Sequence, residues 1–309
     1  MSPASTREPP HASGPVLGRV RETPDRRGGG RGYRGRVPLA TGQAIGVFDS
    51  GVGGLTVLDA CLGALPAEDF AYVGDTAYFP YGDRDPGEVR ERSLAVGRWL
   101  VGAGVKLIVV ACNTATAVAL PDLQRELGTP VIGVIQPEVR AAVHATHNRR
   151  VGLLATAATV RSGSYTRTVA SHDAGVVLTA VACPGLAPVI QTDHAIDDGV
   201  VAMVAGYTAP LIDAGVDTVI LGCTHFGMIE RLLRRTLPGV TLIDGRDEIA
   251  REVTETLDRK RLRRPPGPDG SRRFACTGDP ETFRTLAARF LQMPLGEIEV
   301  IDLPATPSS

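Results

Sequence analysis

The chain has 309 residues, of which 43% are hydrophobic and 22% charged, and its formal net charge is −1. This length allows one large or two medium domains. The near-zero charge provides no global attraction to nucleic acid or an anionic membrane surface, and no apolar run reaches the roughly 18 residues of a membrane span. Five scattered cysteines without a C-x-x-C pair argue against a disulfide framework and structural zinc. We therefore expect reduced thiols in a cytoplasmic protein.

The N-terminal segment, residues 1–44, differs from the rest in composition. It holds eight arginines, three acidic residues and many glycines, as in "RRGGGRGYRGR". It has no apolar core typical of a secretory signal. Because such a composition buries too little apolar surface to offset the ordering entropy, we expect a disordered tail. Arg/Gly tracts can bind RNA weakly, but the composition favours a solvated tail with no nucleic-acid partner.

From residue 45 onward, short apolar runs alternate with helix-like segments. Strands are predicted at 45–48, 70–74, 106–111, 131–135, 151–155, 177–182, 218–222 and 240–244. Helices are predicted at 54–64, 86–103, 115–127, 137–147, 159–171, 196–214, 225–236 and 245–260. The strands show little alternation of apolar and polar residues, which is typical of strands covered on both faces. Alternating strands and helices predict an α/β fold with parallel sheets.

The pattern divides the chain into two similar halves. The first α/β domain is expected over residues 45–136 plus 244–305, and the second over 137–243. A basic Pro/Gly loop at 260–273 interrupts the returning segment, and we expect it to be solvated. Two pseudo-symmetric domains of this kind would face each other across a cleft, and that cleft is the expected active site.

Two segments follow the same order of strand, cysteine and helix. They are "VKLIVVACNTATAVALPDL" (105–123), which contains Cys112, and "DTVILGCTHFGMIERLL" (217–233), which contains Cys223. Ligands bind beyond the carboxyl ends of parallel strands, so both thiols should project into the shared cleft. A helix N-terminus can lower a thiol pKa from its usual value of about 8.5. Two such thiols on opposite walls would remove a proton from one face of a carbon and deliver one to the other, without a metal or redox cofactor.

The other three cysteines lack this context. Free cysteine usually behaves as a small buried hydrophobe, and we expect that role for Cys61, Cys183 and Cys276. Cys112 and Cys223 differ because polar residues follow them directly, in "CNT" and "CTH". Buried polar groups at the start of a core helix are costly unless they have partners. A mirrored pair of thiols also argues against a cysteine hydrolase, which needs one thiol, a base and an oxyanion site.

The remaining polar candidates lie at similar positions. In "IGVFDSGVGGLTVL" (45–58), Asp49 and Ser50 end a strand before a glycine-rich turn, whose N–H groups could bind a carboxylate. The turn lacks the spacing of a P-loop or of G-x-G-x-x-G. Asp49 could orient an ammonium group or assist a thiol, and N-capping is the alternative role. His225 is a candidate general acid or base, because an unperturbed imidazole has a pKa of about 6.5.

Two further loops could line the site. "GDTAYFPYGDR" (74–84) contains Tyr81 and Gly82 after a proline and suits a small-molecule site, with a plain turn as the alternative. "LLATAATVRSGSY" contains Thr156 and Thr159 at a helix start. Helix capping is the expected role there, and substrate contact is the alternative.

Taken together, these residues resemble a known family. The segments "FDSGVGGLTVL", "YVGDTAYFPYG", "VVACNTATA", "GLLATAATVRSGSY", "ACPGLAPVI" and "LGCTHFGMI" look like those of the glutamate racemases, which belong to the cofactor-independent aspartate/glutamate racemase superfamily. The resemblance runs in order over residues 45–290. It implies two α/β domains, a homodimer, no cofactor or metal, and interconversion of L- and D-glutamate for peptidoglycan synthesis.

The resemblance also implies roles for individual residues. It implies that Cys112 and Cys223 are acid/base thiols assisted by Asp49 and His225. It implies that a glutamate substrate contacts Asp49, Ser50, Tyr81, Gly82, Asn113, Thr114, Thr224 and His225.

Three positions depart from the pattern of the family. Gln191 stands where a glutamate usually follows the "CP" segment, Phe226-Gly227 stands where Tyr-Pro is usual, and Gln136 stands where an acidic or another polar residue is frequent. A glutamine cannot exchange a proton near neutral pH, so slower turnover or a bias in one direction is expected unless Asp193 or His194 substitutes. Two alternatives stay open: a racemase of another acidic amino acid such as aspartate, or a ligand-binding regulatory protein on this scaffold.

Overall fold

The computed structural model describes residues 40–192 and 196–304. The predictions for residues 1–39, Asp193 and His194 therefore lie outside the described residues. Residues 40–44 were assigned to the tail but lie against the fold: Lys106 Nζ donates to the Thr41 carbonyl at 2.6 Å, and the Lys106 N–H donates to the Ala44 carbonyl at 2.9 Å. These two carbonyl groups are acceptors for a buried lysine, and the tail boundary at residue 44 remains our prediction.

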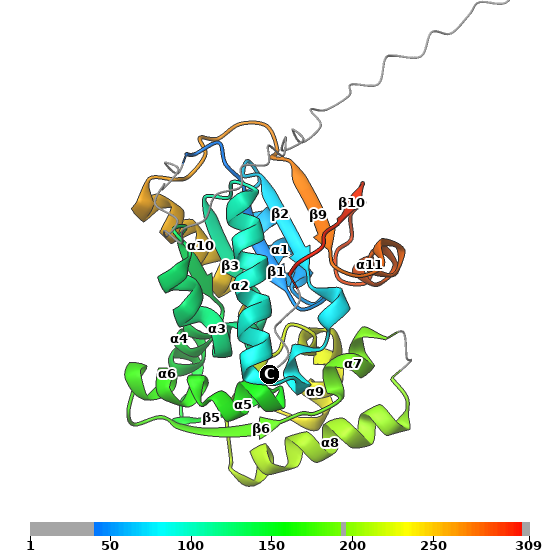
Figure 1. Cartoon of the computed structure of the whole chain (residues 1–309). Helices are drawn as coiled ribbons and strands as arrows, with labels where there is room; N and C mark the ends of the chain where they lie inside the picture. The colour runs from blue at the N-terminus through cyan, green and yellow to red at the C-terminus, as the bar shows by residue number, and fades with distance from the viewer. Residues whose placement is uncertain (1–39, 193–195, 305–309) are drawn as a thin grey trace, which may run out of the picture. The chain divides into compact units, whose positions relative to one another are not determined.

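The first sheet has six parallel strands in the order β10-β9-β2-β1-β3-β4 (Figure 1). They are β1 (Ile45–Asp49), β2 (Phe70–Gly74), β3 (Leu107–Val110), β4 (Val131–Gly133), β9 (Arg272–Cys276) and β10 (Ile298–Val300). The C-terminal segment thus returns to the first sheet through β9 and β10, as expected for residues after 244.

The second sheet has four parallel strands in the order β6-β5-β7-β8. They are β5 (Arg150–Ala155), β6 (Val177–Ala182), β7 (Thr218–Gly222) and β8 (Thr241–Ile243). This order repeats β2-β1-β3-β4 of the first sheet, so β3 and β7 hold equivalent positions. The predicted α/β class with parallel sheets is confirmed, and the topological repeat explains why the two cysteine segments read alike.

Helices cover both faces of the first sheet, because its strands are apolar on both faces. On one face, α1 (Leu55–Ala64), α10 (Arg246–Lys260) and α11 (Pro280–Ala287) share a core with Val47 and Tyr72. On the other, α2 (Pro86–Gly102) and α3 (Asn113–Glu126) share a core with Phe48 and Val73. The strands are thereby fixed in the interior, and only their ends are left for a site.

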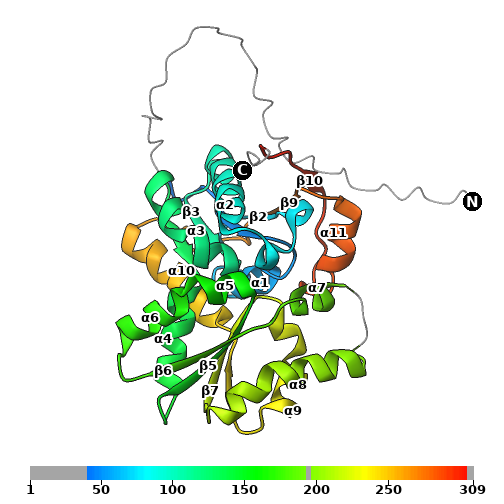
Figure 2. The same ribbon diagram turned by 60° about the horizontal axis from the view of Figure 1, so that its bottom comes forward.

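The second sheet also has helices on both faces, but its edge strand β6 contains no buried residue, so the prediction of strands covered on both faces does not hold for β6. The helices α4 (Ile135–Ala145) and α6 (Ser164–His172) pack on one face. The helices α7 (Leu186–Gln191), α8 (Asp198–Asp213) and α9 (Glu230–Thr236) pack on the other. Figure 2 shows α4 and α6 on the opposite side of β5 and β7 from α8 and α9.

Some predicted helices differ in detail. The predicted helix 159–171 is two helices, α5 (Ala157–Ser162) and α6, because Gly163 adopts a left-handed conformation with φ of 66°. The predicted helix 225–236 begins as the 3₁₀ turn η3 (Phe226–Ile229) before α9. The short elements α7, α11, β9 and β10, and the 3₁₀ turns η1 (Thr76–Tyr78) and η2 (Tyr81–Asp83), are absent from the predicted elements, since such lengths leave no readable period. The predicted loop 260–273 overlaps the first two residues of β9.

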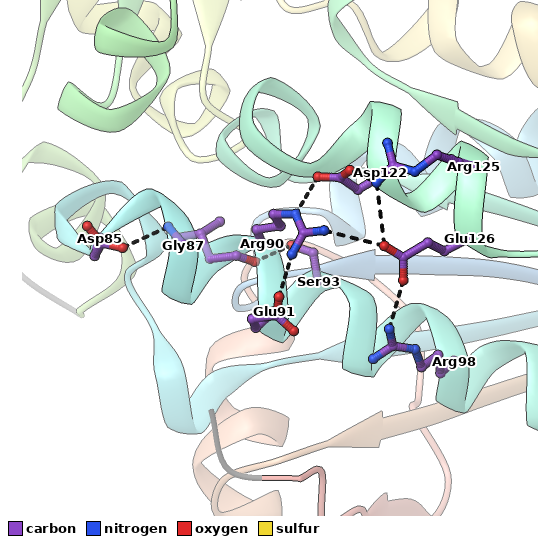
Figure 3. A network of polar contacts seen from close by, with 10 residues as sticks. Asp85, Gly87, Arg90, Glu91, Ser93, Arg98, Asp122, Arg125 and Glu126 are labelled. Atoms are coloured by element: carbon purple, nitrogen blue, oxygen red, sulfur yellow. Dashed lines mark hydrogen bonds and ion pairs between the residues drawn. The ribbon is translucent and has the colours of Figure 1, made fainter. Parts of the chain in front are cut away.

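A surface network joins α2 to α3 (Figure 3). Arg90 of α2 pairs with Asp122 and, at 3.3 Å, with Glu126 of α3, and Arg98 donates to Glu126 at 2.8 Å. Asp85 caps α2 by accepting from the Gly87 N–H at 2.7 Å. Exposed ion pairs contribute about 0–1 kcal/mol each. Their interest here is positional, since α3 begins at Asn113, directly after Cys112.

The two sheets contain the strands that the predicted domain division assigns to each half. The described residues nevertheless form one compact unit by contact, so the boundaries 45–136 plus 244–305 and 137–243 remain our prediction. No helix within residues 40–192 and 196–304 is long and apolar enough to cross a membrane.

Candidate active site

The first part of the site lies where β1 and β3 end. Cys112 is the N-cap of α3: its Sγ accepts from the Ala115 N–H at 3.4 Å and lies 3.8 Å from Ser50 Oγ. Asp49 is the last residue of β1, and its Oδ1 accepts from the Gly51 N–H at 2.8 Å. The two neighbours of β1, which are β2 and β3, lie on opposite sides of it. In open α/β sheets ligands bind in the crevice at such a position.

The second part lies where β5 and β7 end. Thr156 follows β5 and caps α5 through the Thr159 N–H at 3.3 Å, which confirms the expected capping role. Cys223 follows β7, with its Sγ 3.8 Å from His225 Nδ1. His225 Nε2 lies 2.9 Å from Gln191 Oε1. This crevice is the topological equivalent of the first.

Both crevices open into one small cavity. Every site residue predicted from sequence lines it. These are Asp49, Ser50, Tyr81, Gly82, Cys112, Asn113, Thr114, Cys223, Thr224 and His225, and they are joined by Phe79, Pro80, Thr156 and Ala187. The two thiols therefore share one cavity, and the pKa of Cys223 is raised by burial and further by a charge on Cys112.

Direct contacts cross between the two halves within this cavity. Thr224 Oγ1 donates to Asp49 Oδ2 at 3.3 Å, and the hydroxyl oxygens of Thr114 and Thr156 lie 2.9 Å apart. The Tyr81 hydroxyl donates to Asp75 at 2.5 Å, so Tyr81 presents its ring and backbone, and not its hydroxyl, to the cavity.

Glycines allow this close approach. A Cβ on Gly53 would lie 2.4 Å from Thr224 Oγ1 and 2.6 Å from the His225 ring, and one on Gly82 would lie 2.6 Å from Thr156 Cβ. A Cβ on Gly51 would lie 2.7 Å from Gln191 Oε1. The sequence predicts a glycine-rich turn suited to an anion. The structure gives these glycines a further reason, because they lie directly against side chains of the opposite half.

The expectation of lowered thiol pKa values is wrong for this cavity. Burial, and then the charge of Asp49, raises the pKa of Cys112 to about 12, and burial raises the pKa of Cys223 well above its usual value. The Ala115 N–H donates to Cys112 and opposes the shift, but loss of water costs the thiolate more than one N–H returns. Both thiols are therefore protonated near neutral pH.

The two neighbouring groups are also shifted. Burial raises the pKa of Asp49 to about 6, and burial, then the charge of Arg289, lowers the pKa of His225 to about 3. The expected ordinary histidine pKa is thus wrong, and His225 is a neutral imidazole. A glutamine carbonyl oxygen only accepts hydrogen bonds, so Gln191 Oε1 holds the proton on His225 Nε2. The unprotonated Nδ1 faces Cys223.

The remaining sequence expectations concern the three other cysteines and Gln136. Cys61, Cys183 and Cys276 are buried in the cores, as predicted, and all five cysteines are free thiols. Gln136 is exposed and does not line the cavity, so this departure from the pattern does not touch the site. Within the described residues, no group of three or more His, Cys, Asp and Glu side chains is placed to hold a metal ion.

One buried residue beside the site was missed by sequence analysis. Glu138 in the first turn of α4 is 2% exposed and accepts hydrogen bonds from Asn113 and Tyr165. No sequence signal marks it, because a glutamate in the first turn of a helix is an ordinary residue there.

Comparisons with known proteins bear on this arrangement. Residues 45–253 match the family model of the Asp/Glu/Hydantoin racemases. A glutamate racemase of Mycobacterium ulcerans is 43% identical over 266 residues, which cover 85% of this chain and 97% of that protein. One from Mycobacterium leprae is 45% identical over 249 residues, which cover 80% and 91%.

Solved structures of glutamate racemases have a similar fold. Glutamate racemase isoform RacE1 from Bacillus anthracis superimposes with a TM-score of 0.81 at 35% identity, covering 85% of this chain and 99% of that one. The Francisella tularensis enzyme in complex with D-glutamate gives 0.80 at 29% identity, covering 85% and 98%.

Two parallel α/β sheets with a small cavity at their strand ends, in a chain matched along most of its length by racemases, define the class as an isomerase. The chain belongs to the Asp/Glu/Hydantoin racemase family, and within it is similar to glutamate racemases from end to end of those proteins.

Proposed function

We propose that this protein interconverts L- and D-glutamate, with Cys112 and Cys223 as the two acid/base groups. The observation that carries the proposal is that two cysteines, each at the end of an equivalent strand, line one small cavity. The similarity to glutamate racemases over 85% of the chain supports glutamate as the substrate.

The reaction balances without a redox partner. One thiol first gives its proton to the group that assists it, Asp49 for Cys112 or His225 for Cys223. The resulting thiolate takes the proton from Cα, and the C–H electron pair remains on the carbon, delocalised into the α-carboxylate. The other thiol then donates its proton to the opposite face of Cα and becomes the thiolate. Each turnover breaks one C–H and one S–H bond and forms one of each, so the enzyme ends with the proton on the other sulfur.

The composition of the cavity favours a zwitterionic acidic amino acid. Among the described residues that line it, none is Lys or Arg, while hydroxyl and amide groups come from Ser50, Asn113, Thr114 and Thr224. Such neutral donors suit carboxylates, and Asp49 suits the α-ammonium group. Since an adjacent positive charge favours a thiolate, the ammonium group of the substrate would offset the raised pKa values of the thiols.

The assisting roles follow from proximity. We assign Asp49 to Cys112, because after burial the charge of Asp49 is the largest cause of the raised pKa of that thiol, whereas it is a smaller cause for Cys223. We assign His225 to Cys223, because Nδ1 lies 3.8 Å from its sulfur. Substrate contacts are proposed for Asp49, Ser50, Tyr81, Gly82, Asn113, Thr114, Thr224 and His225, all of which line the cavity.

Gln191 cannot bias the final ratio of enantiomers. Two enantiomers have equal free energy in water, so their equilibrium constant is unity and kcat/KM must be equal in both directions. Gln191 can therefore lower kcat/KM only by the same factor in both directions, while kcat can differ between the directions if KM differs in proportion. A bias in one direction can thus appear in kcat but not in the final enantiomer ratio, and slower turnover remains our prediction.

The biological setting belongs to the same proposal. D-glutamate produced in this way would supply peptidoglycan synthesis. Five free thiols favour a reducing compartment such as the cytoplasm. A homodimer is proposed from the resemblance to the family, and the molar mass in solution tests it.

The decisive experiment incubates the purified protein with L-glutamate in deuterated water. We expect the optical rotation to decay to zero while deuterium enters Cα. L-aspartate at the same concentration is the comparison, and we expect it to react more slowly. Binding of glutamate with no deuterium incorporation would overturn the proposal in favour of a ligand-binding protein, and faster turnover of aspartate would reassign the substrate.

A further inference from the structure

Glu138 is a buried carboxyl group that the proposed reaction does not use. Asn113 Nδ2 lies 3.0 Å from both of its oxygens, and the Tyr165 hydroxyl donates to Oε2. Asn113 is adjacent to Cys112 and lines the cavity, whereas Tyr165 belongs to α6 on the second sheet. The carboxyl group thus connects a site residue of the first half to the helices of the second.

Of the four buried carboxyl groups within residues 40–192 and 196–304, Asp75 and Glu68 have a cationic partner, whereas Asp49, which lines the catalytic cavity, and Glu138 have none. Asp75 pairs with Arg92 at 2.6 Å and Glu68 with Lys106 at 2.5 Å. Within residues 40–192 and 196–304, no ion pair reaches Glu138. A buried carboxyl group without a counter-ion is an expensive way to hold helices together, and unusual buried titratable groups beside a cavity are associated with function.

We propose that Glu138 is a positioning residue of the racemase site: it holds the Asn113 amide against Tyr165, and its charge state controls how well the cavity accepts a dicarboxylate substrate. This inference rests on the proposed function for its substrate. The hydrogen-bonded link from Asn113 through Glu138 to Tyr165 is present without substrate, so it does not depend on the proposed function.

The surroundings of Glu138 make its charge variable. Burial raises the pKa of Glu138 to about 8, and the negative charges of Asp244 and Glu248 add to this, while the Tyr165 and Asn113 hydrogen bonds oppose it. Gly245 lies directly against it, since a Cβ there would be 2.2 Å from Glu138 Cγ. The carboxyl group therefore changes charge within the pH range in which enzymes are assayed.

Other charged groups face this region from each neighbouring element. Arg246 donates to Asp244 at 2.7 Å, and Arg140 of α4 pairs with Glu252 of α10 at 3.2 Å, so these two cations are already engaged by carboxylates. Cys223, directly after β7, also lines a second cavity together with Glu138, Asn113 and Thr224, and it is protonated near neutral pH. The remaining neighbour, Tyr165, has a pKa raised well above its usual value by burial.

The sign of the effect follows from like-charge repulsion. Protonated Glu138 offers one donor and one acceptor, as a glutamine would, and keeps Asn113 in place without adding charge. Ionised Glu138 places a negative charge behind the cavity, where it opposes two substrate carboxylates and either thiolate. We therefore expect substrate affinity to fall as the pH rises through about 8.

The same ionisation has a consequence for stability. Because the pKa in the folded protein is above that of an exposed glutamate, the folded state binds more protons between the two values. The associated stabilisation is present below about pH 4.5, the ordinary pKa, and is lost as the pH rises through about 8.

The test compares wild type with Glu138→Gln, Glu138→Ala and the control Glu252→Gln, which removes a half-buried carboxylate of α10 that pairs with Arg140. KM for glutamate is measured across about pH 6 to 9.5, a range that spans this ionisation. We expect a KM that rises several-fold with pH in wild type and in Glu252→Gln but stays flat in Glu138→Gln. In Glu138→Ala, KM should be about 10-fold higher at every pH.

Urea unfolding without substrate, over the same pH range, is the second measurement. Wild type should lose stability with rising pH relative to Glu138→Gln. Matching pH profiles for these two proteins, in either KM or unfolding free energy, would overturn the inference. Absence of racemisation in wild type would refute the proposed function alone, and calorimetric binding of D-glutamate across pH would then replace KM as the test of the charge effect.

Discussion

The two crevices of this protein have the same strand order but different polar groups. At the end of β3, Cys112 has the carboxylate of Asp49 and the hydroxyl of Ser50 beside it. At the end of β7, Cys223 has the imidazole of His225, which in turn bonds to Gln191. Where β1 ends in Asp49, the equivalent strand β5 ends in Ala155, before Thr156.

This difference indicates that the two thiols are not interchangeable. Asp49 titrates near pH 6 and is ionised above that pH, so it can accept a proton on the Cys112 side. His225 is neutral and, with a pKa of about 3, is a weak proton acceptor on the Cys223 side. The repeated topology therefore supplies two thiols with different neighbours: the charge of Asp49 acts more strongly on Cys112 than on Cys223, and only Cys223 has an imidazole beside it.

Replacing either thiol is expected to cause the largest loss of activity. Cys112→Ser and Cys223→Ser should each lower racemisation by at least about 10³-fold, because a serine hydroxyl is far harder to ionise than a thiol. Optical rotation with each enantiomer measures this loss, and circular dichroism checks the fold. Cys183→Ser, a buried thiol of the core, is the control and should retain activity. Unchanged racemisation in both site variants would refute the two-thiol reaction.

Removing the charge of Asp49 is expected to have the next largest effect. Asp49→Asn should lower kcat by about 10²-fold, the usual loss for a group that assists proton transfer. Wild-type activity should rise with pH through about 6 as Asp49 ionises, and this limb should disappear in the variant. A pH–rate profile measures both. A variant that keeps the limb near pH 6 would assign it to another group.

Gly53→Ala tests the contact between the crevices. The added Cβ would meet Thr224 and His225 at 2.6 Å or less, so it should displace the Cys223 side and lower kcat/KM by about 10-fold, since small misplacements of reacting groups are costly. Gly63→Ala is the matched control, because a Cβ there meets nothing within 4 Å and should stabilise α1 by roughly 0.5–1 kcal/mol. Equal kinetics in the two variants would contradict a close fit at Gly53.

Gln191→Glu is expected to change activity least, and it tests the polar groups on the Cys223 side. A carboxylate beside His225 Nε2 favours the imidazolium form, so the pKa of His225 should rise from about 3 towards the assay range. Titration of the imidazole by NMR measures the shift, and kcat should change only a few-fold. Gln136→Glu introduces the same charge at an exposed position and should leave the titration unchanged. Identical titrations in both variants would disprove the Gln191–His225 link.

The parts of this fold that could be predicted are those with long, regular patterns. The strands β1 to β8 and the longer helices were predicted because continuous apolar runs and the helical period are local properties of the chain. The helix break at Gly163 and the short elements α7 and α11 depend on single residues or a few turns. Their boundaries are decided by packing and not by period.

The members of the site could be predicted, but not their chemistry. Asp49, Cys112 and Cys223 follow strands, and the ends of parallel strands meet at one edge of a sheet. The pKa of Cys112 was predicted in the wrong direction because a helix start is visible in sequence, whereas complete burial is not. Glu138 gave no signal, since its partners Asn113 and Tyr165 are 25 and 27 residues away along the chain.

The α/β class, the repeated strand–cysteine–helix segments and the family could be predicted from the amino-acid sequence, because they depend on patterns among neighbouring residues. Three properties could be recognised only in the folded chain: both thiols line one cavity, both are protonated there, and Glu138 links the two halves. Those properties depend on how much water is excluded and on which charges become neighbours, and both are set by segments that are distant in the chain.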